Sequence, residues 1–251
     1  MSKYKFFASV YDRMMDNIPY DDWEQYLLQI LYKFGVSPEA HIAELGCGTG
    51  IMTRKLADDG FVMTGIDLSE EMLEVARSKE TKATYLHMDM RALMLPEKQD
   101  AIISVCDSVN YLLTNEDLYR TMKAARDNLK INGILAFDLK TEYFFISELD
   151  NRVFRENLGD FSYVWKNHYD MEEHIHTYYL EFKSKNKNIG GVQKEVHKQR
   201  AFFAGDIIDA ARRAGFKKAT VYDAFSFERP RINSERLYLV LRNTDNKGHI
   251  K

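Results

Sequence analysis

Residues 42–50 read Ile-Ala-Glu-Leu-Gly-Cys-Gly-Thr-Gly, an apolar run that leads directly into three alternate glycines. Glycine adopts positive φ angles without steric cost and lets another backbone or a bound molecule come close. Residues 51–59, which follow, are expected to form a helix. The stretch therefore predicts a strand that ends in a tight turn and continues as a helix, which is the first crossover of an α/β sheet.

Two further apolar runs also end in an acid. Residues 61–68 contain Asp67, twenty-one residues after the first glycine, which is the length of one helix and one strand. Residues 83–88 are followed by Asp89 and Met90. An acid at the end of the second strand of such a sheet can accept hydrogen bonds from both hydroxyls of a ribose. The three strand ends together predict a nucleotide site, although each acid alone can be an ordinary turn residue.

Strand and helix patterns alternate through most of the chain, which predicts a parallel sheet covered on both faces. We predict an α/β fold with a Rossmann-like, seven-stranded, mostly parallel sheet that has helices on both faces, plus a small antiparallel β insertion. The expected strands are 41–46, 61–67, 83–88, 100–106, 133–139, 217–222 and 236–242, the last of them antiparallel, and the expected helices after the first forty residues are 51–59, 70–79, 115–129 and 205–214.

The alternation stops after residue 140. Residues 152–200 are aromatic, β-branched and partly alternating, and Gly190-Gly191 between two such runs predicts a hairpin turn. The sequence therefore predicts four parts. They are an N-terminal helical segment at 1–39, a core at 40–140 and 205–242, an antiparallel β insertion at 141–204, and a polar tail at 243–251.

Composition narrows the class of protein and leaves the substrate open. The 251 residues are 45% hydrophobic and 29% charged, as in a globular chain with one core and an appended subdomain. No apolar stretch approaches the ~20 residues of a membrane span, and the N-terminal residues lack the apolar stretch of a secretory signal. With two cysteines, we expect a reduced, cytoplasmic protein without a zinc site. The net charge of −3 gives no overall attraction to nucleic acid.

The glycine turn resembles motif I of the class I S-adenosylmethionine-dependent methyltransferases, in which an acid and three glycines stand at every second position: Glu44, Gly46, Gly48 and Gly50. The nicotinamide-enzyme pattern G-x-G-x-x-G would require a glycine at Ile51.

Residues 40–140 and 205–242 together resemble the core of this methyltransferase family. Further matches lie at 100–112 and 129–138, where Ile131-Asn132-Gly133 replaces the more usual Pro-Gly-Gly and still predicts a turn. Tyr11-Asp12 and the inserted His197-x-Gln199-Arg200 resemble the small-molecule branch of the family, which includes sugar amine N-methyltransferases.

The resemblance implies that S-adenosylmethionine is the cofactor and that no metal is needed. The glycines would lie against the methionine portion, and Glu44 would order the turn or act on the methionine ammonium through its neighbours. Asp107, at the carboxyl end of the fourth strand, has a cofactor-binding or a loop-capping role open to it. The expected cofactor-binding residues are Glu44, Gly46, Gly48 and Gly50 at the turn, Asp67 and Leu68 at the ribose, Asp89 and Met90 at the adenine, and Asp107.

The acceptor side is predicted from fewer signals. Tyr11 lies over the transferred methyl group if the N-terminal segment folds across the cofactor, and is otherwise a core aromatic. His197 and Gln199 share one face of a predicted strand, so His197 is a general base if that face meets the pocket, and a solvated histidine if not. His168, His174 and His176 are equally possible as the general base. Cys106 is expected to be a buried, inert thiol. The expected catalytic residues are Tyr11, Asp107 and His197, and the expected acceptor contacts are Asn110, Tyr111 and Gln199.

The resemblance favours transfer of a methyl group by in-line displacement to nitrogen or oxygen of a small molecule. Two alternatives remain, an RNA methyltransferase and a cofactor-binding regulatory protein without activity, and a dehydrogenase is a distant fourth. The RNA alternative rests on the basic residues of the insertion, Lys183, Lys185, Lys187, Lys194, Lys198 and Arg200, which also suit a solvated hairpin. The sequence indicates no membrane partner and leaves the oligomeric state open.

Overall fold

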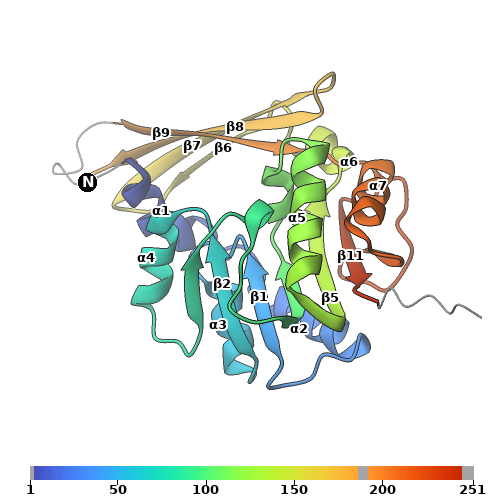
Figure 1. The fold of residues 1–251 in the computed structure, drawn as a ribbon. Coiled ribbons are helices and arrows are strands. Elements are labelled where there is room, and N and C mark those ends of the chain that lie inside the picture. Colours follow the sequence, from blue (N-terminus) through green and yellow to red (C-terminus); the bar gives the residue numbers. More distant parts are fainter. Residues whose placement is uncertain (1–2, 186–191, 245–251) are drawn as a thin grey trace, which may run out of the picture.

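The structure, a computed structural model, describes residues 3–185 and 192–244. The predicted hairpin turn at Gly190-Gly191, Lys187 and the tail from residue 245 lie outside these described residues. Two sheets form the molecule (Figure 1). The larger has seven strands in the order β10 (Ala219–Asp223), β11 (Arg236–Arg242), β5 (Leu129–Lys140), β4 (Gln99–Ser104), β1 (His41–Leu45), β2 (Val62–Asp67) and β3 (Thr84–His87).

The seven-stranded sheet is mostly parallel, as predicted. β1 pairs in parallel with both β2 and β4, β2 with β3, and β4 with β5. β11 pairs antiparallel with β5 and with β10. The carboxyl ends of β1, β2 and β4 therefore meet at one edge of the sheet, which is where open α/β sheets bind their ligands.

The turn predicted at Asn132-Gly133 lies inside a strand and not before it. β5 already begins at Leu129, and its pairing with β4 shifts register between Gln99 and Ala101. Asn132 adopts φ 68°, and its N–H donates to the Asn243 carbonyl at 2.7 Å. Asn132 does adopt a turn conformation, as predicted. Because neighbouring strands pair with the chain on both sides of it, the turn becomes a bulge within β5.

Helices cover both faces of the large sheet. On one face α2 buries Leu27, Ile30 and Leu31, whose spacing puts them on one side of that helix. On the opposite face α5 buries Leu118 and Met122 in the same way. The longer helices are α1 (Lys3–Met14), α2 (Tyr20–Lys33), α3 (Ile51–Asp58), α4 (Glu70–Ser78), α5 (Asn115–Asn128) and α7 (Ala204–Ala214), and the short ones are η1 (Met90–Ala92), η2 (Ser108–Tyr111), α6 (Glu142–Phe144) and the π-helical η3 (Phe145–Leu149).

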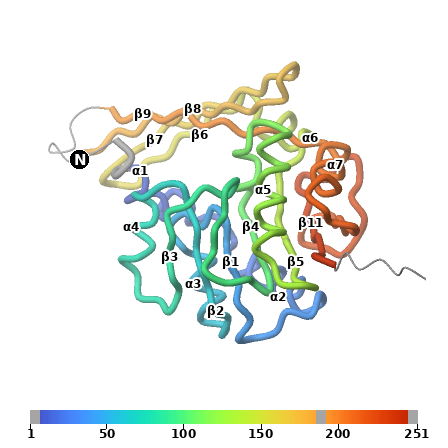
Figure 2. The backbone as a smooth tube through the Cα atoms, in the orientation of Figure 1, coloured from blue at the N-terminus to red at the C-terminus, as the bar shows by residue number. Residues whose placement is uncertain are grey.

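The smaller sheet lies across the edge at which the parallel strands end (Figures 1 and 2). Below it, α1 buries Phe7, Val10 and Met14 against Phe161 and Phe182 of the sheet. Because each buried apolar side chain contributes ~1.5–3 kcal/mol, this contact holds α1 between the two sheets. The four antiparallel strands are β6 (Val153–Asn157), β7 (Phe161–Asp170), β8 (Ile175–Ser184) and β9 (Val192–Arg200).

No helix in residues 3–185 and 192–244 is both long enough and apolar enough to cross a membrane.

Candidate functional site

The glycine turn has the conformation that its sequence predicts. Gly46, Gly48 and Gly50 have φ angles of 69°, 54° and 74°, a region that other residues rarely adopt. The N–H groups of Gly46 and Cys47 donate to the carbonyl of Ile66 at 2.8 and 3.0 Å, which ties the turn to the end of β2.

The three glycines face different surroundings. A Cβ on Gly46 would lie 2.6 Å from the Cβ and Oγ of Ser108, and a Cβ on Gly50 would overlap the ring of Tyr85. A Cβ on Gly48 would meet nothing within 4 Å. Gly46 and Gly50 therefore allow the turn to pack against the protein, whereas Gly48 presents bare backbone to open space, where a bound molecule can come close.

Asp67 lies beside this open backbone. Its Oδ2 accepts a hydrogen bond from the Gly48 N–H and its Oδ1 accepts one from the Ser69 N–H, both at 2.8 Å. Burial raises the pKa of Asp67, while these N–H donors lower it. Each carboxylate oxygen of Asp67 can accept a further hydrogen bond from a hydroxyl group. The side chain of the neighbouring Leu68 is exposed. This arrangement fits the two hydroxyls of a ribose.

Glu44 lies beneath the turn and away from solvent. It is 2% exposed and accepts a hydrogen bond from the Thr53 hydroxyl of α3. Burial raises the pKa of Glu44 to about 7, with a smaller upward contribution from Asp67. Its contacts therefore tie β1 to the helix that follows the turn.

A contact that the sequence did not reveal joins α1 to the turn. The Thr49 hydroxyl donates to Asp12, and Lys79 lies 2.6 Å from the same carboxylate. Lys79 also donates to the Thr49 carbonyl at 2.8 Å. The resemblance singled out Tyr11-Asp12, but no local pattern marks Lys79 because it reaches the turn from the residue after α4.

The end of β3, where Asp89 and Met90 follow, is also close to the glycine turn. The Met90 Cε lies 3.6 Å from where a Cβ on Gly46 would stand. Both oxygens of Asp89 accept hydrogen bonds from Arg91, at 2.7 to 3.1 Å, and Arg91 also donates to Asp117 at 3.0 Å. The hydrogen bonds from Arg91 lower the pKa of Asp89, so it stays a carboxylate available to an amino group, as the adenine assignment requires.

The charges around the turn favour a cationic ligand over a pyrophosphate. Asp67 lies beside the open backbone at Gly48, whereas Asp12 and Lys79 neutralise each other and Glu44 is buried beneath the turn. A pyrophosphate would meet the like charge of Asp67 there, and a sulfonium or ammonium would meet an opposite charge. The residues present therefore fit S-adenosylmethionine better than a nicotinamide dinucleotide.

Asp107 occupies the centre of a buried charge network. Its Oδ2 accepts from Gln199 at 2.7 Å and lies 3.0 Å from Lys140, and its Oδ1 accepts from Arg236 at 3.0 Å. Arg236 also donates to Asp138, which is 0% exposed. Burial opposes ionisation of Asp107, but Lys140 and Arg236 outweigh it and lower its pKa. Asp107 is thus a permanent carboxylate between the two sheets and is not suited to accept a proton.

The structure gives Asn110 a role different from the predicted acceptor contact. Its side chain is fully buried and donates to the carbonyls of Lys140 and Arg200 at 3.1 and 2.8 Å. Its Oδ1 accepts from the Lys140 N–H at 2.9 Å. The hydrogen bonds of this amide therefore hold the ends of β5 and β9 together and leave it without a donor for an acceptor molecule. Sequence position alone could not reveal this because the partners are the ends of two distant strands.

An aromatic cluster lies between α1, η2 and the smaller sheet. The His197 ring stacks on Tyr178 at 4.8 Å between centroids, and Tyr111 approaches it edge-on at 6.0 Å. Phe7 lies 5.4 Å from both His197 and Tyr11. The structure thus brings the predicted Tyr11, Tyr111 and His197 into one place, together with two aromatic residues that the sequence did not identify.

Tyr111 shows that this cluster reaches the surface of the protein. Burial raises the pKa of its hydroxyl, which is paired with the Tyr178 hydroxyl. The side chain as a whole is 45% exposed. One part of the cluster is therefore open to solvent.

His197 and Gln199 lie on the inner face of the smaller sheet, the face that meets the large sheet. Gln199 is 1% exposed and contacts Asp107, and His197 is two residues away on the same face. The sequence left open whether this face is solvated, and the structure excludes that alternative. Glu195, on the same face, was missed as a site residue: its Oε2 lies 3.0 Å from the His197 Nε2.

Two of the other candidate histidines lie away from the cluster, where His168 pairs with Asp150 and His174 with Glu142. His176 lies 5.7 Å from Tyr178 of the cluster but is fully buried against Phe145.

Cys106 is half-buried and not fully buried as expected. Its partial burial still raises the pKa of its thiol, which keeps the thiol protonated.

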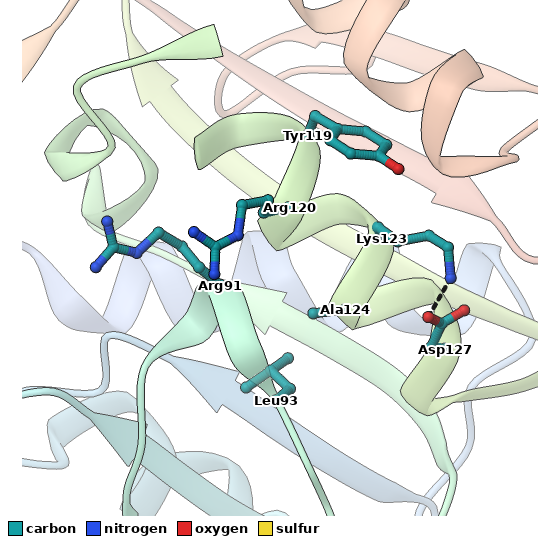
Figure 3. Close-up of a pocket in the computed structure, with 7 residues that line it drawn as sticks. All are labelled: Arg91, Leu93, Tyr119, Arg120, Lys123, Ala124 and Asp127. Carbon is teal, nitrogen blue, oxygen red and sulfur yellow. Dashed lines mark hydrogen bonds and ion pairs between the residues drawn. The ribbon is translucent and has the colours of Figure 1, made fainter. Parts of the chain in front are cut away.

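A groove of about 330 Å³ lies between α5 and the segment that carries Arg91 and Leu93 (Figure 3). Its charged residues are largely neutralised, because Lys123 pairs with Asp127 and Arg91 with two acids. None of the residues that line it belongs to the glycine turn or the aromatic cluster. We therefore place the functional site at the strand ends and not in this groove.

Known proteins are similar to this chain in sequence and in overall fold. A family profile described as "Methyltransferase domain" matches residues 42–133. "Putative methyltransferase YqeM" from Bacillus subtilis (strain 168) is 34% identical over 239 residues, which cover 94% of this chain and 95% of that protein. The crystal structure of an S-adenosylmethionine-dependent methyltransferase from Clostridium acetobutylicum ATCC 824 is 25% identical, with a TM-score of 0.80 over 96% of this chain and 99% of that one. The dTDP-3-amino-3,4,6-trideoxy-alpha-D-glucopyranose N,N-dimethyltransferase of Streptomyces venezuelae is 32% identical over 103 residues, 41% of this chain and 44% of that protein.

Proposed function

The chain belongs to the class I S-adenosylmethionine-dependent methyltransferases, and on that premise we propose that it methylates a nitrogen or oxygen atom of a small molecule. The acceptor would bind beside the solvent-exposed part of the aromatic cluster. The four-stranded insertion would serve as its lid, and the large sheet would carry the cofactor.

The observation that supports this proposal most is the short path from the glycine turn to the cluster. The Ser108 hydroxyl donates to the Gly46 carbonyl at 3.1 Å, and the preceding Asp107 accepts from Gln199 at 2.7 Å. His197 is one step further along β9 on the same face. A methyl group held at the turn would therefore lie next to the aromatic walls.

The bound cofactor supplies a methyl group that is already strongly electrophilic, so the protein has mainly to position and shield the reactants. Asp67 and the open backbone at Gly48 would hold the ribose and the methionine portion. The aromatic side chains would exclude water and align the acceptor. His197 would take the acceptor's proton, and Tyr11, which α1 places beside the cluster, would lie over the methyl group.

A relative supports a small acceptor. The Streptomyces venezuelae protein acts, by its name, on an amino sugar nucleotide, and its similarity covers 41% of this chain.

The RNA alternative gains no support from the described residues of the insertion. Lys194 lies opposite Glu181 in the sheet and pairs with it at 3.3 Å. The one acid among the basic residues, Glu195, points to the inner face. The outward surface is therefore partly neutralised, as on a solvated sheet.

Replacing Asp67 with alanine tests the cofactor half of the proposal. We expect Asp67→Ala to weaken S-adenosylhomocysteine binding about tenfold or more, because two hydroxyl partners are lost. Isothermal titration calorimetry measures it. Asp100→Ala is a matched control, since Asp100 also accepts a backbone N–H but at the opposite end of the sheet. Unchanged affinity in Asp67→Ala, or tight binding of NADH by the native protein, would refute the assignment.

A further inference from the structure

We propose that Lys79 is a positioning residue for methyl transfer, because its ammonium joins the Asp12 carboxylate of α1 to the Thr49 carbonyl of the glycine turn. This bridge would hold Tyr11, the neighbour of Asp12, over the transferred methyl group. The role rests on the proposed function, since it requires S-adenosylmethionine to bind at the turn.

The first observation is that one ammonium group contacts both α1 and the glycine turn. The Lys79 Nζ lies 2.6 Å from the Asp12 Oδ2 and donates to the Thr49 carbonyl at 2.8 Å. An ammonium has three donors, so it can bind both oxygens at once. The Lys79 side chain is 19% exposed, so water weakens these contacts less than those of an open surface pair. Lys79 thus sets the distance between α1 and the turn.

The second observation concerns Thr49, which stands between the open backbone of Gly48 and the start of α3. Thr49 is 1% exposed, and its hydroxyl donates to the Asp12 Oδ1 while its carbonyl accepts from Lys79. The three side chains therefore form a closed ring of contacts. Because Gly48 directly precedes Thr49, a shift of this ring would move the backbone that meets the cofactor.

The attachment of α1 to the smaller sheet does not depend on Lys79. An apolar cluster joins this helix to the sheet, and Arg13 donates to Asp160, in the loop between β6 and β7, at 2.6 Å. Loss of Lys79 would therefore leave α1 bound to the smaller sheet and weaken its hold on the glycine turn. That separation would carry Tyr11 away from the methyl group while both sheets stay folded.

Lys79 also follows α4 directly, where a cation can stabilise the last carbonyls of a helix. That contribution would not require Asp12. The two roles therefore differ in whether the effects of changing Lys79 and Asp12 depend on each other.

Calorimetry and hydrogen–deuterium exchange with S-adenosylhomocysteine test the positioning role. We expect Lys79→Met to weaken binding about fivefold, because it removes a charged donor to a partly exposed acid. At about ten times the Kd, the ligand should slow amide exchange of residues 7–14 about tenfold in native protein, and less than about twofold in Lys79→Met at ten times its own Kd.

Two further variants serve as rescue and control. Lys79→Arg keeps the charge and the donors, so it should restore both the affinity and the slowing of exchange. Arg77→Met should behave as native protein, because Arg77 lies in the same region of α4 and pairs with Glu70 at an exposed site. Binding of S-adenosylhomocysteine by each variant also shows that it folds.

Asp12→Asn distinguishes the bridge from support of α4. It removes the charge that Lys79 binds and keeps an oxygen for the Thr49 hydroxyl. Combined with Lys79→Met, it should weaken binding no further than either change alone, because both remove the same contact. Additive losses, no rescue by Lys79→Arg, or native behaviour of Lys79→Met would overturn the positioning role alone. If native protein did not bind S-adenosylhomocysteine, the proposed function would fail as well.

Discussion

The glycine-turn half of the site and the insertion half are built in opposite ways. In the first, backbone groups and acids close together in sequence do the work, as when Asp67 accepts from Gly48, 19 residues away. In the second, most contacts join distant segments: Tyr111 and Tyr178 are 67 residues apart, and Asp107 and Gln199 are 92 apart. The cofactor side is therefore fixed by local geometry, and the acceptor side by how one sheet docks on another.

Removing Arg236 should have the largest effect, because this residue supports the buried network through which Gln199 of the insertion contacts the large sheet. It neutralises Asp107 and Asp138, and its guanidinium lies 4.8 Å from the centre of the Trp23 ring. Arg236→Met would leave these two acids with Lys140 alone, and breaking such a buried pair typically costs ~3–5 kcal/mol. We expect that loss in the free energy of unfolding, measured by urea denaturation.

Arg242→Met is the matched control for this change. Arg242 ends the same strand and donates to the Phe34 carbonyl at 2.7 Å, with no acid recorded beside it among the described residues. We expect a loss of about 1 kcal/mol there. Equal losses in the two variants would show that Asp107 and Asp138 do not depend on Arg236 for their neutralisation.

The contrast between the halves also explains how far sequence reasoning reached. The alternation of strands and helices, the conformation of the turn and the two acidic strand ends follow from local spacing, and all of them could be predicted. The role of Asn110 could not, because it depends on partners chosen by tertiary packing. Glu195 could have been found, since it stands two residues before His197 on the same face of one strand. Asn110 has the residue type of an acceptor contact and is used up by backbone groups of two strand ends.

A change of pH should affect stability through a group in each half, and the two effects should run in opposite directions. Burial raises the pKa of Glu44 to about 7 from 4.5, so the folded protein binds a proton that the unfolded chain releases between these values. Its contribution to stability is therefore present below pH 4.5 and lost as pH rises to about 7. Glu44→Gln should gain up to about 3 kcal/mol relative to native protein at pH 8, at ~1.4 kcal/mol per pKa unit. Urea denaturation across this range measures it.

His176, in the insertion, is the counterpart of opposite sign. Burial lowers its pKa from 6.5 to about 4, so the unfolded chain takes up a proton that the folded protein refuses. Stability is then lost as pH falls from 6.5 to about 4, and His176→Gln should flatten that loss. Were both variants to change the pH profile in the same direction, the assigned burial of one of the two groups would be wrong.

Two alanine substitutions within the turn should separate its structural glycine from its ligand-facing one. Both Gly46→Ala and Gly48→Ala place a side chain at positive φ, which costs roughly 1–2 kcal/mol. Only Gly46→Ala adds a clash, with Ser108, for roughly 1–3 kcal/mol more, and Ser108→Gly in the same protein should recover that part. Thermal denaturation measures the stabilities.

The losses of cofactor affinity should follow the opposite order to the losses of stability. That reversal is the sharpest test of the division into halves. The methyl group of Gly48→Ala meets no protein atom within 4 Å, so it would project into the space that the cofactor needs. We therefore expect Gly48→Ala to lose more affinity for S-adenosylhomocysteine than Gly46→Ala combined with Ser108→Gly, although it loses less stability than Gly46→Ala alone. If affinity instead followed stability across the series, the open backbone at Gly48 would not face the ligand. The cofactor would then have to lie on another side of the turn, where Asp67 could not serve it.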